Sequence, residues 1–191
     1  DCVGYTYDIS TTYENTDIFF RIEKETGHEI HGLVNNAGVY IQKPVTEYTS
    51  EDFEITMNTN LRGPMFMSSA YIRYCQARGC QGNIVMTSSN RGLFGDYGPY
   101  GISKAGINQY VQGLGREMIG SGIRVNAVAP GMTASDINGI RPDGDLYTRA
   151  SKGQRVIRPE EIAEVVCFLL SDRSRCINGA IIPCDEGDSI R

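Results

Sequence analysis

We predict an α/β fold in which a doubly wound parallel sheet carries helices on both faces. Short apolar runs alternate along the chain with longer segments that have helical periodicity, as strand–helix–strand units require. Ile84–Met86 is apolar at consecutive positions, which is typical of a strand buried on both faces. Glycine and proline residues separate many of the segments. With 191 residues, the chain is long enough for one domain with a sizeable core.

The first 80 residues predict two strands and two helices. The strands are short runs of β-forming residues, and the helices show an apolar stripe or a capping sequence. In chain order they are a strand at Val3–Tyr7, a helix at Thr12–Thr26, a strand at Ile30–Val34, and a helix from Thr49 to Arg78 interrupted near Gly63-Pro64. Gly27 and Gly79 follow the two helices and are expected to end them.

The remainder of the chain continues this alternation. It predicts a strand at Asn83–Thr87, a helix at Tyr100–Ile119, a strand at Ile123–Ala129, a helix at Glu160–Leu170 and a strand at Gly179–Pro183. Met132–Arg155 lacks strong periodicity and contains glycine and proline residues. We interpret it as a loop with a short helix that covers a site.

Three predicted loops follow strands of the sheet, at Asn35–Gly38, at Ser88–Gly95 and from Pro130 to about Ser135. In open parallel sheets, ligands bind outside the carboxyl ends of the strands. The three loops should therefore meet at one edge of the sheet and form a cleft. Tyr100 begins the helix that follows the second loop, so we expect its side chain in that cleft.

Tyr100 and Lys104 are four residues apart and lie on one face of the predicted helix. A free tyrosine titrates near ~10, which is too high for ready proton exchange at neutral pH. A positive charge about 4 Å away, at an effective dielectric of about 20, would favour the phenolate by roughly 4 kcal/mol. Burial of the phenol opposes this effect. A phenol beside an ammonium, facing serines at the end of a strand, would suit proton transfer. Taken alone, however, the pair would more often be an accidental surface contact.

Several motifs, taken in order, resemble those of the short-chain dehydrogenase/reductase family. They are Asp8-Ile9, Asn35-Asn36-Ala37-Gly38, Asn60 within NTNLRG, Ser88-Ser89, Tyr100-x-x-x-Lys104, and Arg124-Val125-Asn126 followed by Pro130-Gly131. The resemblance covers about residues 3–188 and is specific as a set. It implies a Rossmann-like fold, one domain over residues 1–191, and an NAD(P)-dependent oxidoreductase that interconverts an alcohol and a ketone by hydride transfer.

The resemblance implies a catalytic set of Tyr100, Lys104, Ser89 and Asn60. Tyr100 would exchange a proton with the substrate oxygen, and Lys104 would lower the pKa of Tyr100 and hold the cofactor ribose. Ser89 would polarise the substrate carbonyl. Ser88 is the alternative, because the 11 residues from Ser89 to Tyr100 are slightly fewer than in many family members. Asn60 would anchor a relay water, or would otherwise be a helix amide that satisfies local backbone.

The same resemblance implies a cofactor, NAD or NADP, with its own group of residues. Asp8 and Ile9 would contact the adenine, and Asn35, Asn36, Ala37 and Gly38 would support the sheet centre and line the ribose. Pro130 and Gly131 would direct Met132, Thr133 and Ser135 towards the carboxamide and the pyrophosphate, and the choice between these two hydroxyls stays open. Without the resemblance, the asparagine-rich segment would be a plain turn and Asp8 a helix cap.

The chain departs from the family pattern at its start. A dinucleotide fold needs a glycine-rich turn, T-G-x-x-x-G-x-G, after its first strand, and this sequence has none. In the usual strand order 3-2-1-4-5-6, the first two strands would be missing, and Ile30–Val34 would present an open edge. We expect the chain to be N-terminally incomplete. The alternative is a shortened relative that no longer binds a dinucleotide.

Charge and composition argue against a nucleic-acid partner, a membrane partner and a metal site. The net charge is −5, from 23 acidic and 18 basic residues without long like-charge blocks, so we expect no nucleic-acid partner. No apolar run approaches the ~20 residues that span a bilayer, and no signal peptide is visible, so we expect no membrane partner. The six cysteines have no C-x-x-C spacing, so we predict no metal site. Several lie in apolar segments, which favours a reducing cytoplasm.

Two other functions also fit this sequence. The protein could be a catalytically silent dinucleotide-fold protein with a binding or regulatory role. An epimerase or dehydratase is a third hypothesis, which the lack of a longer C-terminal substrate domain disfavours. The small alcohol or ketone substrate and the choice between NAD and NADP are open, with Asn90–Tyr97 and Met132–Arg155 as the expected specificity loops. By resemblance alone, we expect a homodimer or homotetramer through the helices around residues 61–78 and 103–119.

Overall fold

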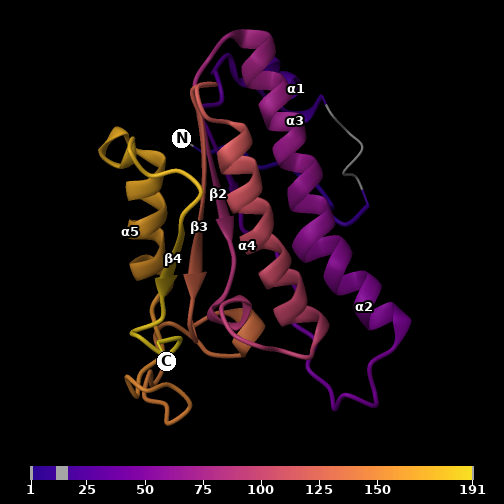
Figure 1. The fold of residues 1–191 in the computed structure, drawn as a ribbon, viewed down its shortest axis with the longest axis vertical. Coiled ribbons are helices and arrows are strands. Elements are labelled where there is room, and N and C mark those ends of the chain that lie inside the picture. The colour runs from indigo at the N-terminus through magenta and orange to yellow at the C-terminus, as the bar shows by residue number, and fades with distance from the viewer. Residues whose placement is uncertain (1, 12–16, 191) are drawn as a thin grey trace.

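The computed structural model describes residues 2–11 and 17–190, which form a parallel sheet flanked by helices (Figure 1). The sheet has four strands in the order β1-β2-β3-β4 within these residues, and all neighbouring strands are parallel. The strands are β1 (Gly32–Asn35), β2 (Gly82–Thr87), β3 (Ile123–Pro130) and β4 (Ile181–Cys184). The main helices are α1 (Ile18–Thr26), α2 (Ser50–Met57), α3 (Gly63–Arg78), α4 (Pro99–Glu117) and α5 (Pro159–Leu170). The predicted fold class is therefore confirmed.

The core has two parts, one on each face of the sheet. Successive side chains of a strand point to opposite faces. In β2, Ile84 and Met86 pack on the side of α1, α3 and α4, while Val85 packs on the side of α5. In β3, Val125 and Val128 divide in the same way. A strand covered on both faces needs apolar residues at successive positions, which explains the Ile84–Met86 run.

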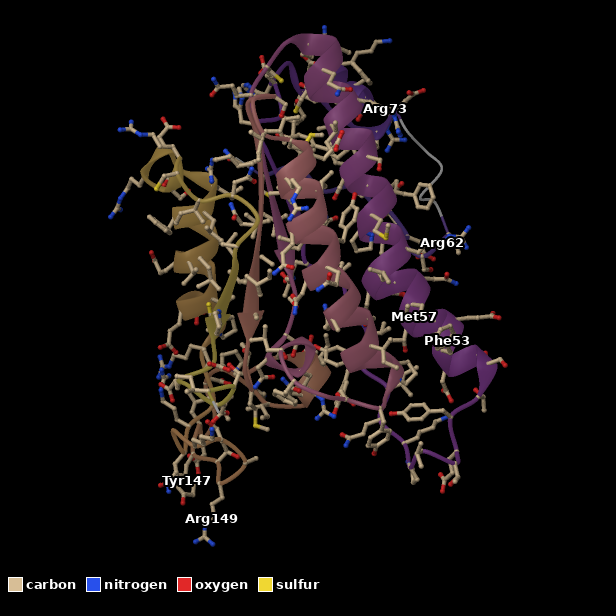
Figure 2. The ribbon with its side chains drawn as sticks, in the orientation of Figure 1. Phe53, Met57, Arg62, Arg73, Tyr147 and Arg149 are labelled. Atoms are coloured by element: carbon tan, nitrogen blue, oxygen red, sulfur yellow. The ribbon has the colours of Figure 1, made fainter. Side chains whose placement is uncertain are left out.

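The loops that follow the strands gather at one end of the molecule. Figure 1 shows the arrowheads of β2, β3 and β4 at this end, with the C-terminus beside them. Residues 132–158 form the largest loop here, with a short 3₁₀ turn, η3 (Asp136–Asn138). Isolated bridges join Thr133 to Ile157 and Tyr147 to Arg155. Figure 2 shows Tyr147 and Arg149 at the outer tip of this loop.

The helical segment from Ser50 to Arg78 has no break, but its α-helical geometry is interrupted just before Gly63-Pro64, close to the predicted position. Between α2 and α3 the chain forms one π-helical turn, η1 (Asn58–Arg62), in which the Gly63 N–H donates to the Asn58 carbonyl. Pro64 has no N–H and cannot donate to the Asn60 carbonyl four residues earlier. The wider turn absorbs this local conflict without ending the helix.

The predicted start of this helix is confirmed in detail. Thr49 is the N-cap, and its hydroxyl accepts a hydrogen bond from the Asp52 N–H while the Asp52 carboxylate accepts one from the Thr49 N–H. Asp52 also accepts from the Lys43 ammonium over 2.7 Å. These hydrogen bonds, that of Lys43 first, lower the pKa of Asp52 to about 2. The loop before α2 is thereby tied to the helix.

The predicted strand at Val3–Tyr7 is wrong, because these residues have no strand conformation. A strand needs a hydrogen-bonded neighbour, and β1 pairs with β2 alone among the described strands. The predicted open edge is therefore present at β1, where Val34 is 40% exposed. The predicted helix at Thr12–Thr26 begins at Ile18 in the structure, and residues 12–16 lie outside the described residues.

Among the residues that the structure describes, every helix is too short or too polar to span a membrane. In residues 2–11 and 17–190, no three histidine, cysteine or acidic side chains come together in a way that could hold a metal ion.

Candidate active site

Two cavities adjoin one another at the carboxyl ends of the strands. The larger cavity, of about 510 Å³, lies between β1, β2, the start of the long loop and α5. The smaller cavity, of about 370 Å³, lies beneath the long loop and beside the loop that precedes α4. Five residues line both cavities: Ser89, Tyr100, Gly131, Ile137 and Asn138. The side chains of Ser89 and Tyr100 are thus on the wall between the two spaces.

Tyr100 lies in the first turn of α4, after the N-cap residue Gly98. Its ring packs edge-on against the ring of Tyr40, with 4.7 Å between the centroids. Burial raises the pKa of Tyr100, and the Ser89 hydroxyl and the Arg91 charge only partly oppose this effect. The expected net lowering of the Tyr100 pKa is therefore wrong, because desolvation of the phenolate outweighs the nearby positive charges.

Lys104 is buried one turn further along α4, with 4% of its surface exposed. Its ammonium donates a hydrogen bond to the Thr87 carbonyl over 2.7 Å and lies 5.6 Å from the centroid of the Tyr100 ring. Burial lowers the pKa of Lys104 to about 8. The two side chains share a helix face as predicted, but the ammonium is beneath the aromatic ring and is bound to the end of β2.

The two candidate serines differ in what their hydroxyls contact. The Ser88 hydroxyl donates to the Asn108 side-chain oxygen over 2.6 Å. The Ser89 hydroxyl caps the 3₁₀ turn η2 (Asn90–Gly92) by accepting from the Arg91 N–H, and it faces both cavities. Ser89, the first choice from the sequence, is therefore the serine whose side chain is within reach of the Tyr100 phenol.

The loop between Ser89 and Tyr100 is packed tightly on α4. The Asn108 amide donates to the Gly92 carbonyl over 2.9 Å, so the same side chain holds Ser88, just after β2, and Gly92, the last residue of η2. Gly92 has to be a glycine, because a Cβ there would come within 2.7 Å of the Lys104 carbonyl carbon. Sequence reasoning missed Asn108, although its position four residues after Lys104 places it on the same face of the helix.

Asn60 is buried in η1 and does not line either cavity. Its side-chain oxygen accepts from the Val39 N–H over 2.8 Å, and its amide donates to the Val39 carbonyl over 2.9 Å and to the Ser103 hydroxyl over 3.3 Å. The side chain therefore satisfies backbone, as the simpler interpretation expected, but that backbone is 21 residues away. Asn60 fixes the loop that follows β1 against the start of α4.

The residues of the Asn35–Gly38 segment have different environments. Asn35 is buried, and its amide donates to the Ser68 hydroxyl, so it joins β1 to α3. The Asn36 side chain accepts a hydrogen bond from the Thr87 hydroxyl, and Asn36 and Gly38 line the larger cavity. Ala37 is exposed and lines neither cavity.

The remaining residues of the predicted cofactor set divide into two groups. Pro130, Gly131 and Thr133 line the larger cavity, together with Ser135, while Met132 lines the smaller one. Asp8 and Ile9 line neither. Asp8 is exposed and accepts from the N–H and the hydroxyl of Ser10, and Ile9 packs against Gly63.

The smaller cavity has polar residues that the sequence did not single out as site residues. Tyr40, Arg91, Lys152 and Asp188 contribute to its wall. Arg91 belongs to the predicted specificity loop Asn90–Tyr97, and its position two residues after Ser89 could have indicated it. Lys152 belongs to the other predicted specificity loop, Met132–Arg155. Tyr40 and Asp188 had no local signal, because loops from distant parts of the chain bring them to this cavity.

The chain is similar to proteins of one family along almost its whole length. The family model described as enoyl-(acyl carrier protein) reductase matches residues 1–189. A tropinone reductase homolog of Arabidopsis thaliana is 31% identical over 192 residues, which covers 98% of this chain and 74% of the relative. A 3-oxoacyl-[acyl-carrier-protein] reductase of Thermotoga maritima is 31% identical over 187 residues, which covers 96% of this chain and 75% of the relative.

The fold of the chain is also similar to that of solved structures. A structure described as ElxO with NADP bound has a TM-score of 0.87 at 28% identity and covers 98% of this chain and 78% of its own. A putative gluconate dehydrogenase from Agrobacterium tumefaciens has a TM-score of 0.84 at 27% identity, with 97% and 75% covered.

Proposed function

Because the chain belongs to the short-chain dehydrogenase/reductase family, we propose that it is an NAD(P)-dependent oxidoreductase that interconverts an alcohol and a ketone. The observation that carries this proposal is the common wall of the two cavities. Ser89 and Tyr100 line both spaces, so a carbonyl group bound in the smaller cavity would meet their hydroxyls at the boundary with the larger one. General acid–base catalysis needs a proton donor within hydrogen-bond reach of the reacting oxygen, and a carbonyl at this wall would have one.

The larger cavity is the proposed place of the nicotinamide and its ribose. Gly38 lines this cavity next to Lys104, and a Cβ there would make only ordinary contact with the Lys104 ammonium, at 3.8 Å. Asn36, Lys104 and Thr133 offer polar groups to ribose and carboxamide, while Ile162 and Val166 of α5 form an apolar side. When bound, a nicotinamide group would supply or accept the hydride. These residues fit that half of a dinucleotide, and Asp8 and Ile9 are not included in the proposed set.

Tyr100 is the proposed acid and base. Its raised pKa keeps the phenol protonated at neutral pH, so it is ready to donate a proton to the oxygen of a ketone. Ser89 would donate a hydrogen bond to the same oxygen and stabilise the negative charge that develops there. In the reverse direction, the phenolate of Tyr100 would accept the proton of an alcohol.

Lys104 and Asn60 would support this exchange from behind the phenol. The Lys104 ammonium, below the Tyr100 ring, would stabilise the phenolate and hold the ribose. The Asn60 side chain is used by Val39 and Ser103, so Asn60 would hold a relay water through its main-chain carbonyl. That carbonyl has lost its usual helical donor because Pro64 has no N–H.

A Tyr100→Phe variant of the full-length protein tests the proposal. We expect kcat for reduction of ketones with NADH or NADPH to fall at least about 100-fold, because the general acid is removed. Tyr5→Phe is the matched control, since Tyr5 packs near Arg21, lines neither cavity and lies outside the predicted specificity loops. Turnover of Tyr100→Phe within about tenfold of the parent would contradict the assignment. Failure of the parent to bind NAD(P)H would favour a silent binding protein instead.

We also propose that the protein forms a homodimer or homotetramer. The main support is the family resemblance, which implies contacts through the helices around residues 61–78 and 103–119. Large apolar side chains are exposed on the two helices that make up most of these ranges, with Phe66 on α3 and Ile102 on α4. Figure 2 shows Arg73 on the outer side of α3. Light scattering of the purified protein should give the mass of two or four chains, and Phe66→Glu should lower it. The mass of a single chain for the parent would contradict this.

A further inference from the structure

The smaller cavity contains a guanidinium group that the proposed proton transfer does not use. Arg91 follows Ser89 by two residues in η2 and lines this cavity together with Ser89 and Tyr100. The charge of Arg91 is also close enough to Tyr100 to oppose the rise in the pKa of the phenol. A permanent positive charge therefore shares the substrate side of the site with the groups at the reacting carbonyl.

One edge of this guanidinium is held in place by a buried carboxylate. The Arg91 Nε donates to an Asp96 oxygen over 2.6 Å, and the other Asp96 oxygen accepts from the Gly98 N–H over 2.9 Å. The Asp96 side chain is only 4% exposed. Gly101 makes the space for it, because a Cβ there would overlap the Asp96 side chain. The orientation of Arg91 is thus fixed by the start of α4.

The other edge of the guanidinium is available for a ligand. Within residues 2–11 and 17–190, the hydrogen bonds of the Arg91 side chain end at Nε, so Nη1 and Nη2 have no protein acceptor. The side chain is 36% exposed, and its Cζ lies 5.9 Å from the centroid of the Tyr40 ring. The ring of Tyr40 in turn packs on Tyr100. The two terminal NH2 groups of Arg91, next to the reacting groups and with four N–H donors between them, therefore have no acceptor among the described residues.

Around this cavity, the positive charges of Arg91 and Lys152 are balanced formally by the carboxylates of Asp188 and Asp96. Asp188 accepts from the main-chain N–H of Lys152, and the Lys152 ammonium donates to the Ile190 carbonyl. The wall therefore offers a ligand the directed N–H donors of Arg91 and not an excess of charge. Asn90 and Asn138 also line this cavity and carry side-chain amides. A neutral hydrocarbon substrate would leave these groups without partners, which costs affinity.

We propose that Arg91 binds a carboxylate of the substrate, so that the site takes small oxo acids and the matching hydroxy acids. The terminal nitrogens of an arginine match the two oxygens of a carboxylate in spacing and plane. This inference rests on the proposed function, because it takes Ser89 and Tyr100 as the groups at the reacting carbonyl. Arg91 would then fix which end of the substrate enters beneath the long loop.

Substrate pairs that differ only in charge test this inference. Pyruvate, acetoacetate and levulinate, each with its methyl ester, would be compared with the holoenzyme of the parent, Arg91→Met and Arg91→Lys. We expect the parent to prefer at least one acid over its ester in kcat/KM. Arg91→Met should reduce that preference about 10- to 100-fold through a higher KM for the acid, and Arg91→Lys should restore part of it. Arg73→Met, on the outer side of α3, is the matched control.

A binding measurement separates this inference from the proposed function. Saturation-transfer NMR with lactate and β-hydroxybutyrate, each against its amide, needs no turnover. Binding of the acids, weakened in a folded Arg91→Met variant, would support the inference even if no ketone were reduced. The inference is overturned if the parent treats acids and neutral partners alike, or if Arg91→Met leaves the preference unchanged. Turnover of neutral ketones would in that case leave the oxidoreductase proposal standing.

Discussion

The Lys104 ammonium donates a hydrogen bond to the Thr87 carbonyl over 2.7 Å, and this bond joins α4 to the end of β2. Lys104 is buried one helical turn after Tyr100, so the bond also fixes the direction in which α4 presents the phenol. A buried ammonium with one carbonyl partner is costly to keep charged, which is why burial lowers the pKa of Lys104 to about 8.

The first prediction concerns the titration of Lys104. Among the four lysines of the chain, labelled at Cε and followed by NMR, one should titrate near pH 8 and be lost in Lys104→Met. The folded pKa is below the unfolded value of about 10.4, so the unfolded chain binds more protons between these values. Burial of the charged Lys104 side chain therefore lowers the free energy of unfolding by its full amount below about pH 8. This destabilisation decreases as the pH rises towards 10.4. Lys104→Met should therefore stabilise the protein more at pH 7 than at pH 10. Urea unfolding at the two pH values measures this, and an equal change in the free energy of unfolding at both pH values would refute it.

The second prediction concerns the pH dependence of turnover. Burial raises the pKa of Tyr100, so the phenol needed for ketone reduction is present throughout the neutral range, and the phenolate needed for alcohol oxidation is scarce. Below this pKa, the rate of oxidation should rise up to about tenfold for each pH unit, while reduction should not rise. Initial rates in both directions across the alkaline range measure this. An oxidation rate that is independent of pH would show that Tyr100 is not the base.

The third prediction concerns the buried amide of Asn60. Asn60→Leu would leave the N–H and carbonyl of Val39 without their partners, at a cost of about 2–4 kcal/mol in the free energy of unfolding. Asn58→Leu is the control, because Asn58 lies in the same π turn and its side chain makes no hydrogen bond to the described residues. Chemical denaturation compares the two. Equal stability of both variants would show that the Asn60–Val39 contact contributes little.

The fourth prediction uses two glycines of α4. Gly101→Ala places a methyl group against the Asp96 side chain and should destabilise the protein by about 1–3 kcal/mol while displacing the carboxylate that holds Arg91. Gly113→Ala in the same helix meets no atom within 4 Å and should stabilise it by about 0.4–1 kcal/mol. Thermal unfolding of both variants gives the sign of each effect. Destabilisation of the same size at both positions would contradict the close contact.

The local elements were predictable because their causes lie within a few residues of one another. The Thr49–Asp52 cap joins positions three residues apart, and Gly79 ends its helix at a φ of 65° that favours glycine. The apolar run Ile84–Met86 predicted a strand covered on both faces, and the structure buries Ile84 and Met86 on one face and Val85 on the other. The strand at Val3–Tyr7 was wrong because β-forming composition does not supply a hydrogen-bonded neighbour.

The sequence alone determined the order of strands and helices, the end of the sheet at which the loops meet, and the pairing of Tyr100 with Lys104 on one helix face. Only the tertiary structure decided that burial outweighs charge at Tyr100, that the Asn60 side chain is occupied by Val39, and that Asp8 and Ile9 lie outside the cavities. It also decided that both terminal NH2 groups of Arg91 stay without an acceptor among the described residues beside Tyr100. The reason is physical: periodicity and capping act between neighbours in sequence, whereas desolvation and loop contacts depend on which distant segments pack together.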